Sequence, residues 1–306
     1  MLIIGENIHI ISPTVKAAVA DRDHQAIQRL ALSQVEHGAD LLDLNIGPQK
    51  KRGVEVMEWI VDAVQAVADV PLSLDTTNVA AIEVGLKRAK QQAMINSTSA
   101  DPERLNTGMP LAAQYNAKII ALTMGKSGIP TTAEGRVEMA MEVLIPKAME
   151  LGIPMSDLYL DPLVLTVNGT QEHAPETLNA VRFFKQLTDP PPMTVVGLSN
   201  VSNSIPHENR SLLNRTFLVM LMAAGLDAAI ADPLDEELGE YLRIVEGRDD
   251  STALGNLLLT LYDKTAAMEE LEPSDVDMSD PAQVDVWKTV RILCNKVIYA
   301  HSYLRT

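Results

Sequence analysis

Short runs of aliphatic residues alternate along the chain with longer stretches whose apolar residues recur at helical spacing. A run of about four to eight apolar residues is typical of a strand buried on both faces, whereas apolar positions three or four apart predict an amphipathic helix. Stretches such as 56–68 and 136–151 fit the helical pattern. The runs that predict strands are 2–8, 41–47, 71–75, 93–97, 118–124, 158–163, 194–200 and 227–232.

This alternation predicts the fold class. Eight strand-then-helix units indicate a parallel sheet with right-handed crossovers. Gly38, Gly152 and Gly225 each precede a predicted strand, where helices commonly end at a glycine with positive φ. No GxGxxG turn follows the first run, as a doubly wound nucleotide-binding sheet would favour, and eight strands is the number that closes a barrel. The sequence therefore predicts an α/β fold, a (βα)8 TIM barrel.

The segment 246–285 departs from this alternation. It carries eleven carboxylates against Arg248 and Lys264, a net charge of -9 within a total of -16. A helical pattern covers 252–264, and a closing helix is predicted from about Pro281 to Tyr303. We interpret 246–285 as an acidic insertion within a single domain spanning 1–306. The insertion either contacts a partner protein or forms a solvated flap or a dimer contact.

Composition and charge narrow the functional classes. The net charge of -16 argues against nucleic acid and against an anionic membrane surface as partner. No apolar stretch reaches the roughly 18 residues needed to span a bilayer. The single cysteine, Cys294, cannot build a cysteine-based metal site, and we expect no metal in the chain. The N-terminus lacks a basic region and a cleavage site, so we expect a cytoplasmic protein.

Polar residues end most of the aliphatic runs, and active sites of TIM barrels form at these strand ends. Carboxylates only accept hydrogen bonds, whereas amides also donate, so the set suits a flat heterocycle with donors and acceptors on its edge. The 2-amino and N3–H groups of a pterin are such donors. No nucleophile stands beside a base in this set. The strand-end residues are Glu6, Asn7, Asp43, Asn45, Asp75, Asn96, Thr123, Asp161, Ser199, Asn200 and Asp232.

Each of these residues also has a purely structural interpretation. An Asp or Asn after a strand is commonly the N-cap of the next helix, which applies to Asp232 and could apply to Asp75 and Asn200. Asp43 and Asn45 differ, because they alternate with leucines and therefore share one face of their strand. Two polar groups on so apolar a strand require partners or a ligand, which favours a binding role.

Several motifs follow one another in an order that resembles a known family. They are GENI (5–8), LDLNIGP (42–48), LDTTN (74–78), MINST (94–98), LTMGKSGIP (122–130), LYLDPL (158–163), EHAPE (172–176), GLSNVS (197–202) and LLNRTFL–MAAGLDAAIAD (212–232). Together they resemble the methyltetrahydrofolate:corrinoid protein methyltransferases, pterin-binding barrels of the acetyl-CoA pathway and of anaerobic O- and N-demethylase systems. The resemblance runs from residue 1 to about residue 240, and 246–285 has no counterpart in the compact members.

The resemblance assigns roles to particular residues. It implies that Asp75, Asn96 and Asp161 hold the edge of the pterin, and that Asn200 approaches N5, which bears the methyl group, as the catalytic residue. It also makes further residues contributors to the pterin site: Glu6, Asp43, Asn45, Ser199 and Arg215.

The reaction implied by the resemblance is methyl transfer between N5 of methyltetrahydrofolate and the cobalt of a corrinoid protein, or the reverse. Co(I) would attack in line while hydrogen bonding or protonation activates N5. The cobalamin would be carried by the partner, either a corrinoid/iron–sulfur protein or a small demethylase corrinoid protein, and the enzyme would be a homodimer. The alternatives are a dihydropteroate-synthase-like enzyme, whose Lys/Arg phosphate motif is missing here, and a non-catalytic folate-binding protein.

Overall fold

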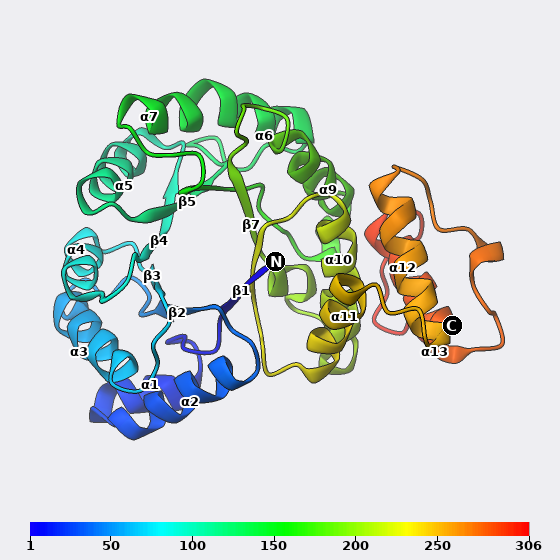
Figure 1. The fold of residues 1–306 in the computed structure, drawn as a ribbon, viewed down its shortest axis with the longest axis horizontal. Helices are drawn as coiled ribbons and strands as arrows, with labels where there is room; N and C mark the ends of the chain where they lie inside the picture. Colours follow the sequence, from blue (N-terminus) through cyan, green and yellow to red (C-terminus); the bar gives the residue numbers. More distant parts are fainter. Residues whose placement is uncertain (306) are drawn as a thin grey trace.

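Eight parallel strands close into a barrel in chain order, with β8 returning to pair with β1 (Figure 1). The structure is a computed structural model that describes residues 1–305. Each strand overlaps one of the predicted runs, so the predicted TIM barrel is confirmed. The strands are β1 Leu2–Gly5, β2 Leu41–Asn45, β3 Leu72–Asp75, β4 Met94–Ser99, β5 Lys118–Leu122, β6 Leu158–Asp161, β7 Met193–Gly197 and β8 Ala228–Ala231.

Helices form the outer layer of the barrel, and two more stand outside it beside α10 and α11 (Figure 1). None of the helices within residues 1–305 is long and apolar enough to cross a membrane. The helices are α1 Pro13–Asp21, α2 His24–Glu36, α3 Gly53–Gln65, α4 Val79–Arg88, α5 Pro102–Tyr115, α6 Ala133–Met139, η1 Ala140–Leu144, α7 Ile145–Glu150, α8 Val167–Thr170, α9 His173–Phe184, η2 Leu198–Ser202, α10 His207–Ala223, α11 Glu236–Gly247, α12 Ala253–Ala266, η3 Pro273–Asp275 and α13 Pro281–Leu293.

The two faces of each strand contribute side chains to two different hydrophobic cores, because successive side chains point to opposite faces. In β2, Leu42 and Leu44 belong to the core between strands and helices, while Leu41 belongs to a separate cluster inside the barrel. The inner cluster also holds Met94 and Tyr159, which fill the barrel below the strand ends. Because side chains alternate between faces, the residues two and four positions after an inner apolar residue also point inward.

The helix ends follow the predicted glycines. Gly38, Gly152 and Gly225 have φ values of 94°, 70° and 98°, a region that costs glycine little and other residues much more. Each stands shortly after a helix and before the next strand, where the chain reverses toward the barrel. The sequence expectation for these three turns is confirmed.

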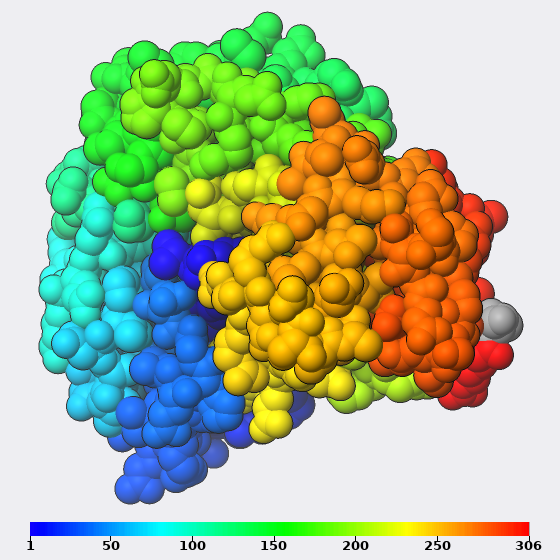
Figure 2. Space-filling model, turned by 45° about the vertical axis from the view of Figure 1, so that its right-hand side comes forward, coloured from blue at the N-terminus to red at the C-terminus, as the bar shows by residue number. Residues whose placement is uncertain are grey.

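The acidic segment is packed against the barrel and is not a solvated flap. Helix α12 matches the predicted helical stretch. Its Leu257, Leu258 and Leu261 are at most 1% exposed and share one hydrophobic cluster with Leu213 and Phe217 of α10. Figure 2 shows the segment, in orange, as a protrusion seated on the side of the barrel. The apolar face of the predicted helical stretch therefore covers α10, so this part of the segment is not a solvated flap.

The closing helix is shorter than the predicted span of Pro281 to Tyr303. Helix α13 ends at Leu293, and Asn295 takes a left-handed conformation with φ 55°. The amide of Lys296 then donates to the carbonyl of Arg291 at 2.8 Å, which caps the helix end. Apolar residues continue beyond this point, so the sequence pattern alone did not indicate the stop.

Candidate functional site

A cavity of about 470 Å³ opens where the strands end at the C-terminal mouth of the barrel. The inward column of each strand supplies its lining: Leu41 is followed by Asp43 and Asn45, and Tyr159 by Asp161. All the residues to which the family resemblance assigns a role, except Arg215, line this cavity, whereas the strand-end residues Asn7, Thr123 and Asp232 do not. Those that line it are Glu6, Asp43, Asn45, Asp75, Asn96, Asp161, Ser199 and Asn200.

The strand register brings three of these side chains into one row. Asn45 pairs with Asp75, and Asp75 pairs with Asn96, across β2, β3 and β4. The Asn45 amide donates to Asp75, and the Asn96 amide donates to Asp43 at 3.1 Å. Asp43 also accepts from the hydroxyl of Ser73 at 2.6 Å. This wall of the cavity therefore carries carboxyls that are fixed in place by amide and hydroxyl donors.

The electrostatics of this wall favour a ligand that donates hydrogen bonds. Burial is the main cause that raises the pKa of both Asp43 and Asp75. The charge of Asp43 raises the pKa of Asp75 further, because two carboxylates in one small site repel each other. A ligand with two adjacent N–H groups would stabilise the ionised forms that burial disfavours.

Asp161 ends β6 with its side chain 6% exposed. Its Oδ1 accepts from the backbone amide of Leu163 at 2.7 Å, and Leu163 has a positive φ of 70°. Burial raises the pKa of Asp161 to about 7, against the opposing effects of that amide and of the Arg136 guanidinium. Asp161 therefore changes charge near neutral pH in the free protein.

Glu6 and Ser199 connect the first and seventh strands at the mouth. The Ser199 hydroxyl donates to Glu6. Burial raises the pKa of Glu6 to about 7, while the Ser199 hydrogen bond and the charge of Arg210 lower it. Arg210 comes from the first turn of α10 and lines the cavity, as His9 does from the loop after β1.

Asn200 lies in the short 3-10 helix η2 that follows β7. Its Oδ1 accepts from Asn203 Nδ2 at 3.1 Å, which leaves its Nδ2 without a hydrogen-bond partner among residues 1–305. A Cβ at Gly197 would lie 2.9 Å from this nitrogen, so the glycine makes room for the amide. Asn200 thus presents a free donor at the cavity.

The helix-cap interpretations of Asp75 and Asn200 do not hold. Helix α4 is capped by Asn78, whose side chain accepts from the amide of Ala81 at 3.2 Å. The N-cap position of α10 is Pro206. The same interpretation of Asp232 is also wrong, because α11 is capped by Asp235, whose side chain accepts from the amide of Leu238 at 3.2 Å, while Asp232 accepts from the amide of Leu234 at 2.9 Å in the preceding turn.

The structure places Arg215 outside the cavity. Its guanidinium lies over the ring of Tyr241 at 5.0 Å and donates to Ser211 at 2.8 Å and to Glu237. Five residues along a helix turn a side chain by about 140° relative to the first, so Arg210 and Arg215 of α10 face different ways. Arg210 therefore occupies the place expected of Arg215.

Sequence reasoning missed four polar residues that line the cavity: His9, Ser97, Asn203 and Arg210. His9 follows the GENI motif, and Ser97 follows Asn96 within MINST. Position next to a motif was the only sequence signal for these two. For Asn203 and Arg210, the direction of the side chain depends on the turn after β7 and gave no sequence signal.

The raised carboxyl pKa values predict how stability varies with pH. Glu6 and Asp161 hold their protons in the folded state up to about pH 7 but release them near pH 4 when unfolded. The stabilisation that these two carboxyls give the folded state is therefore fully present below pH 4 and is lost as pH rises through 7. We expect the unliganded protein to melt several degrees lower at pH 8 than at pH 5. Glu6→Gln and Asp161→Asn should each flatten this slope in thermal melts, and an unchanged slope in both would contradict it.

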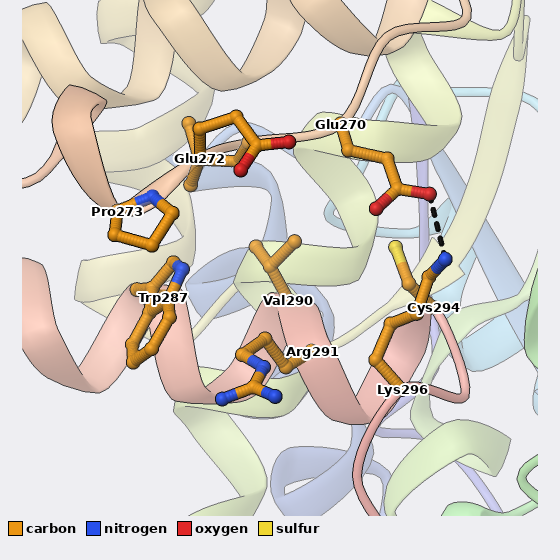
Figure 3. Close-up of a pocket in the computed structure, with 9 residues that line it drawn as sticks. Glu270, Glu272, Pro273, Trp287, Val290, Arg291, Cys294 and Lys296 are labelled. Atoms are coloured by element: carbon orange, nitrogen blue, oxygen red, sulfur yellow. Dashed lines mark hydrogen bonds and ion pairs between the residues drawn. The ribbon is translucent and has the colours of Figure 1, made fainter.

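A second cavity of about 340 Å³ lies between α13 and the segment after α12 (Figure 3). Lys296 and Glu270 form an ion pair at 2.7 Å there, and Arg291 lies 4.9 Å from the Trp287 ring. Burial raises the pKa of the Cys294 thiol to about 11, so it is protonated at neutral pH. Its two carboxylates, Glu270 and Glu272, are accompanied by no amide side chain in the lining, so this cavity does not resemble the one at the barrel mouth.

No group of three or more His, Cys, Asp or Glu side chains within residues 1–305 is arranged to hold a metal ion. The mouth of the barrel instead combines carboxyl acceptors with amide donors. Residues 13–232, which include most of this lining, match the family model described as "Pterin binding enzyme". The chain belongs to the pterin binding enzyme family.

Individual pterin binding enzymes and their relatives give further comparisons. The chain is 27% identical over 241 residues to a methylcorrinoid:tetrahydrofolate methyltransferase of Eubacterium limosum, covering 78% of this chain and 87% of that protein. It is 31% identical over 240 residues to the methionine synthase of Mycobacterium leprae (strain TN), which is 75% of this chain but 20% of that protein. The chain thus spans about a fifth of the length of that methionine synthase.

A solved structure shares the fold. The dihydropteroate synthase of Coxiella burnetii, in complex with pteroic acid, superposes with a TM-score of 0.60 over 81% of this chain and 94% of that one. The two sequences are 17% identical. This likeness supports the barrel architecture of the pterin binding family and carries no argument about the reaction.

Proposed function

We propose that this pterin binding enzyme transfers a methyl group between N5 of methyltetrahydrofolate and the cobalt of a corrinoid protein. The name of the Eubacterium limosum relative pairs a methylcorrinoid with tetrahydrofolate, and that relative is similar over most of both chains. The corrinoid, carried by a partner protein, supplies the cobalt that exchanges the methyl group. This chain supplies the folate site and the control of N5.

The observation that carries the proposal is the distribution of donors and acceptors across the barrel mouth. Asp75 on β3 and Asn200 after β7 are four strands apart in a closed eight-stranded barrel, so they stand on opposite walls. A pterin has its 2-amino and N3–H donors at one end of the bicyclic ring and N5 toward the other. The wall that carries the carboxyls of Asp43 and Asp75, here called the acceptor wall, therefore suits the 2-amino and N3–H edge of the pterin, while Asn200 on the opposite wall faces N5.

Asn200 acts on N5 as the bond to the methyl group breaks. N5 gains electron density when the methyl leaves, and the free Nδ2–H of Asn200 can donate to it at that moment. Glu6 and Asp161, whose pKa values are about 7, can exchange a proton with solvent near neutral pH. Glu6 and Asp161 would thus supply a proton to N5 when the methyl group leaves, and would accept one when the reaction runs in reverse.

The corrinoid partner docks over the mouth of the barrel. A corrin ring with its side chains does not fit beside a pterin in a cavity of about 470 Å³, so the corrinoid must approach from outside. A corrinoid/iron–sulfur protein or a small demethylase corrinoid protein would present it in this way. The proposal includes a homodimer whose contacts leave the mouth free.

A dihydropteroate-synthase-like reaction is the alternative, and it is not favoured. The likeness to that enzyme is one of fold, at 17% identity, whereas the relatives with higher identity are methyltransferases and methionine synthases. Supplying a pteridine pyrophosphate and p-aminobenzoate tests it directly. Formation of dihydropteroate, with no methyl transfer to reduced cobalamin, would replace the proposed function.

The two carboxyls assigned to the pterin, Asp75 of the acceptor wall and Asp161 at the end of β6, give the direct test of the folate site. Asp75→Asn or Asp161→Asn exchanges a charged acceptor for an amide, and each charge-assisted hydrogen bond lost is worth about 1.5–3 kcal/mol. We expect affinity for methyltetrahydrofolate to fall roughly tenfold to a hundredfold in titration calorimetry. Asp62→Asn, an exposed change on α3, is the matched control and should bind like wild type. Wild-type affinity in both site variants would exclude these carboxyls from the site.

A further inference from the structure

Arg136 is the largest side chain that is completely buried, and no ion pair explains it. Its three hydrogen bonds go to the Pro130 carbonyl at 3.3 Å, the Thr177 hydroxyl at 2.9 Å and His173 Nδ1 at 3.0 Å. No carboxylate of the described chain forms a salt bridge with it. Burial lowers the pKa of the guanidinium, yet arginine keeps its charge in proteins. Burying this cation is costly, and Glu176 and Asp161 offset part of the cost by attracting it from beyond ion-pair distance.

A short chain of hydrogen bonds links Arg136 to the cavity wall. Thr177, which is fully buried in α9, accepts from Arg136, and its single hydroxyl proton is shared between the carbonyls of Leu163 at 3.1 Å and of His173 at 2.9 Å. The amide of the same Leu163 donates to Asp161 Oδ1 at 2.7 Å. The backbone N–H of Leu163 is thus bonded to Asp161, and its backbone carbonyl is bonded to the Arg136–Thr177 pair.

The tied position is a strained one. Leu163 has a φ of 70°, which a branched side chain rarely adopts, and it lines the cavity next to Asp161. Such a conformation persists where surrounding contacts fix it. The contact through Thr177 fixes it from behind the wall, out of reach of the ligand.

We propose that Arg136 is a positioning residue, which holds Asp161 in its pterin-binding orientation through Thr177 and the turn at Leu163. The inference rests on the proposed function, because it takes Asp161 as a ligand of the pterin. Arg136 touches neither substrate nor partner in this arrangement. It acts by fixing where the carboxyl points and by placing one positive charge behind it.

The charge behind Asp161 gives the proposal a second measurable consequence. The other titratable groups at the cavity are Glu6, His9, Asp43, Asp75 and Arg210, and His173 and Glu176 face Arg136 from α9. Glu176 accepts from the amide of Ala133 at 2.7 Å, and its charge also raises the pKa of Arg136. Arg136 lowers the pKa of Asp161 against the effect of burial. Without it, Asp161 would ionise only at higher pH.

The test separates the two effects with three variants of the whole chain. Arg136→Met removes both the charge and the hydrogen bonds, Arg136→Lys keeps the charge, and Thr177→Val removes the linking hydroxyl at nearly constant volume. Each variant is titrated with methyltetrahydrofolate between pH 5.5 and 8.5, and its melting temperature is measured. Thr289→Val is the control, since Thr289 is equally buried in the remote helix α13.

We expect Arg136→Met to weaken methyltetrahydrofolate binding about tenfold at pH 7, the effect of losing one buried hydrogen bond. The variant should also move the pH midpoint of binding upward, because the charge that lowers the pKa of Asp161 is gone. Arg136→Lys and Thr177→Val should lose affinity with little movement of the midpoint, because the charge remains. Thr289→Val should bind like wild type. An Arg136→Met variant with a lower melting temperature but wild-type affinity and midpoint would overturn the inference. If wild type itself binds no methyltetrahydrofolate, the proposed function fails instead.

Discussion

Replacing Asn200 by alanine is expected to lower kcat for methyl transfer by about 10²–10³-fold, the loss typical of removing one donor that faces developing charge. The reason lies in the free Nδ2–H of Asn200, whose proposed hydrogen bond to N5 would strengthen as the methyl group leaves. An interaction made mainly in the transition state lowers kcat more than it lowers affinity. Affinity for methyltetrahydrofolate should therefore fall much less, because the acceptor wall is intact.

The measurement is single-turnover methyl transfer to free reduced cobalamin, together with calorimetric binding and thermal melts. Asn203→Ala is the informative companion, since Asn203 lines the cavity and fixes the Asn200 amide through the bond at 3.1 Å. It should lower kcat by a smaller factor than Asn200→Ala. Normal turnover in Asn200→Ala, with a lowered melting temperature, would show that the residue is structural.

Deleting 246–285 and joining the ends with a short linker is expected to abolish cooperative folding. The deletion removes α12, whose Leu257, Leu258 and Leu261 cover α10. Burying one leucine side chain stabilises a protein by about 1.5–3 kcal/mol, so three contribute about 5–9 kcal/mol. That is comparable with the whole stability of a typical domain, about 5–15 kcal/mol. Helix α10 would also lose the cover of its apolar face.

Thermal melts and soluble yield measure this outcome. A charge variant is the matched control: Asp250→Asn with Glu269→Gln neutralises two exposed carboxylates of the segment and keeps its apolar face. It should melt like wild type. A change in its KM for a corrinoid protein, with altered salt sensitivity, would show that the segment contacts the partner. A deletion protein that melts cooperatively near the wild-type temperature would contradict the packing argument.

The barrel and much of its mouth could be predicted from local sequence. Strand position depends on runs of aliphatic residues, and the face of a strand on which a side chain lies depends on a two-residue period. Both are properties of neighbouring residues. Asp43 and Asn45 could therefore be placed on one face of β2, and Asp75, Asn96 and Asp161 could be grouped at one mouth of the barrel because each ends an aliphatic run.

Features that depend on the rotation of a helix could not be predicted in this way. Arg210 and Arg215 stand in one helix and carry the same charge, but only the seating of α10 on the barrel directs Arg210 to the cavity and Arg215 to Tyr241. Arg136 lies behind Asp161 because α6 and α9 pack together there. The sequence carries no local signal for either contact.

The amino-acid sequence was sufficient to establish the strand–helix repeat, the strand faces and the acidic side chains that end the strands. Each of these features follows from residues only a few positions apart. Which helix residues reach the site, and what covers α10, depended on the packing of the folded chain. In 246–285, the helical pattern of 252–264 was visible in the sequence, but only the packing of Leu258 showed that its apolar face covers α10. Such contacts join residues tens of positions apart, and their geometry is set when the layers pack, not by the period of either segment.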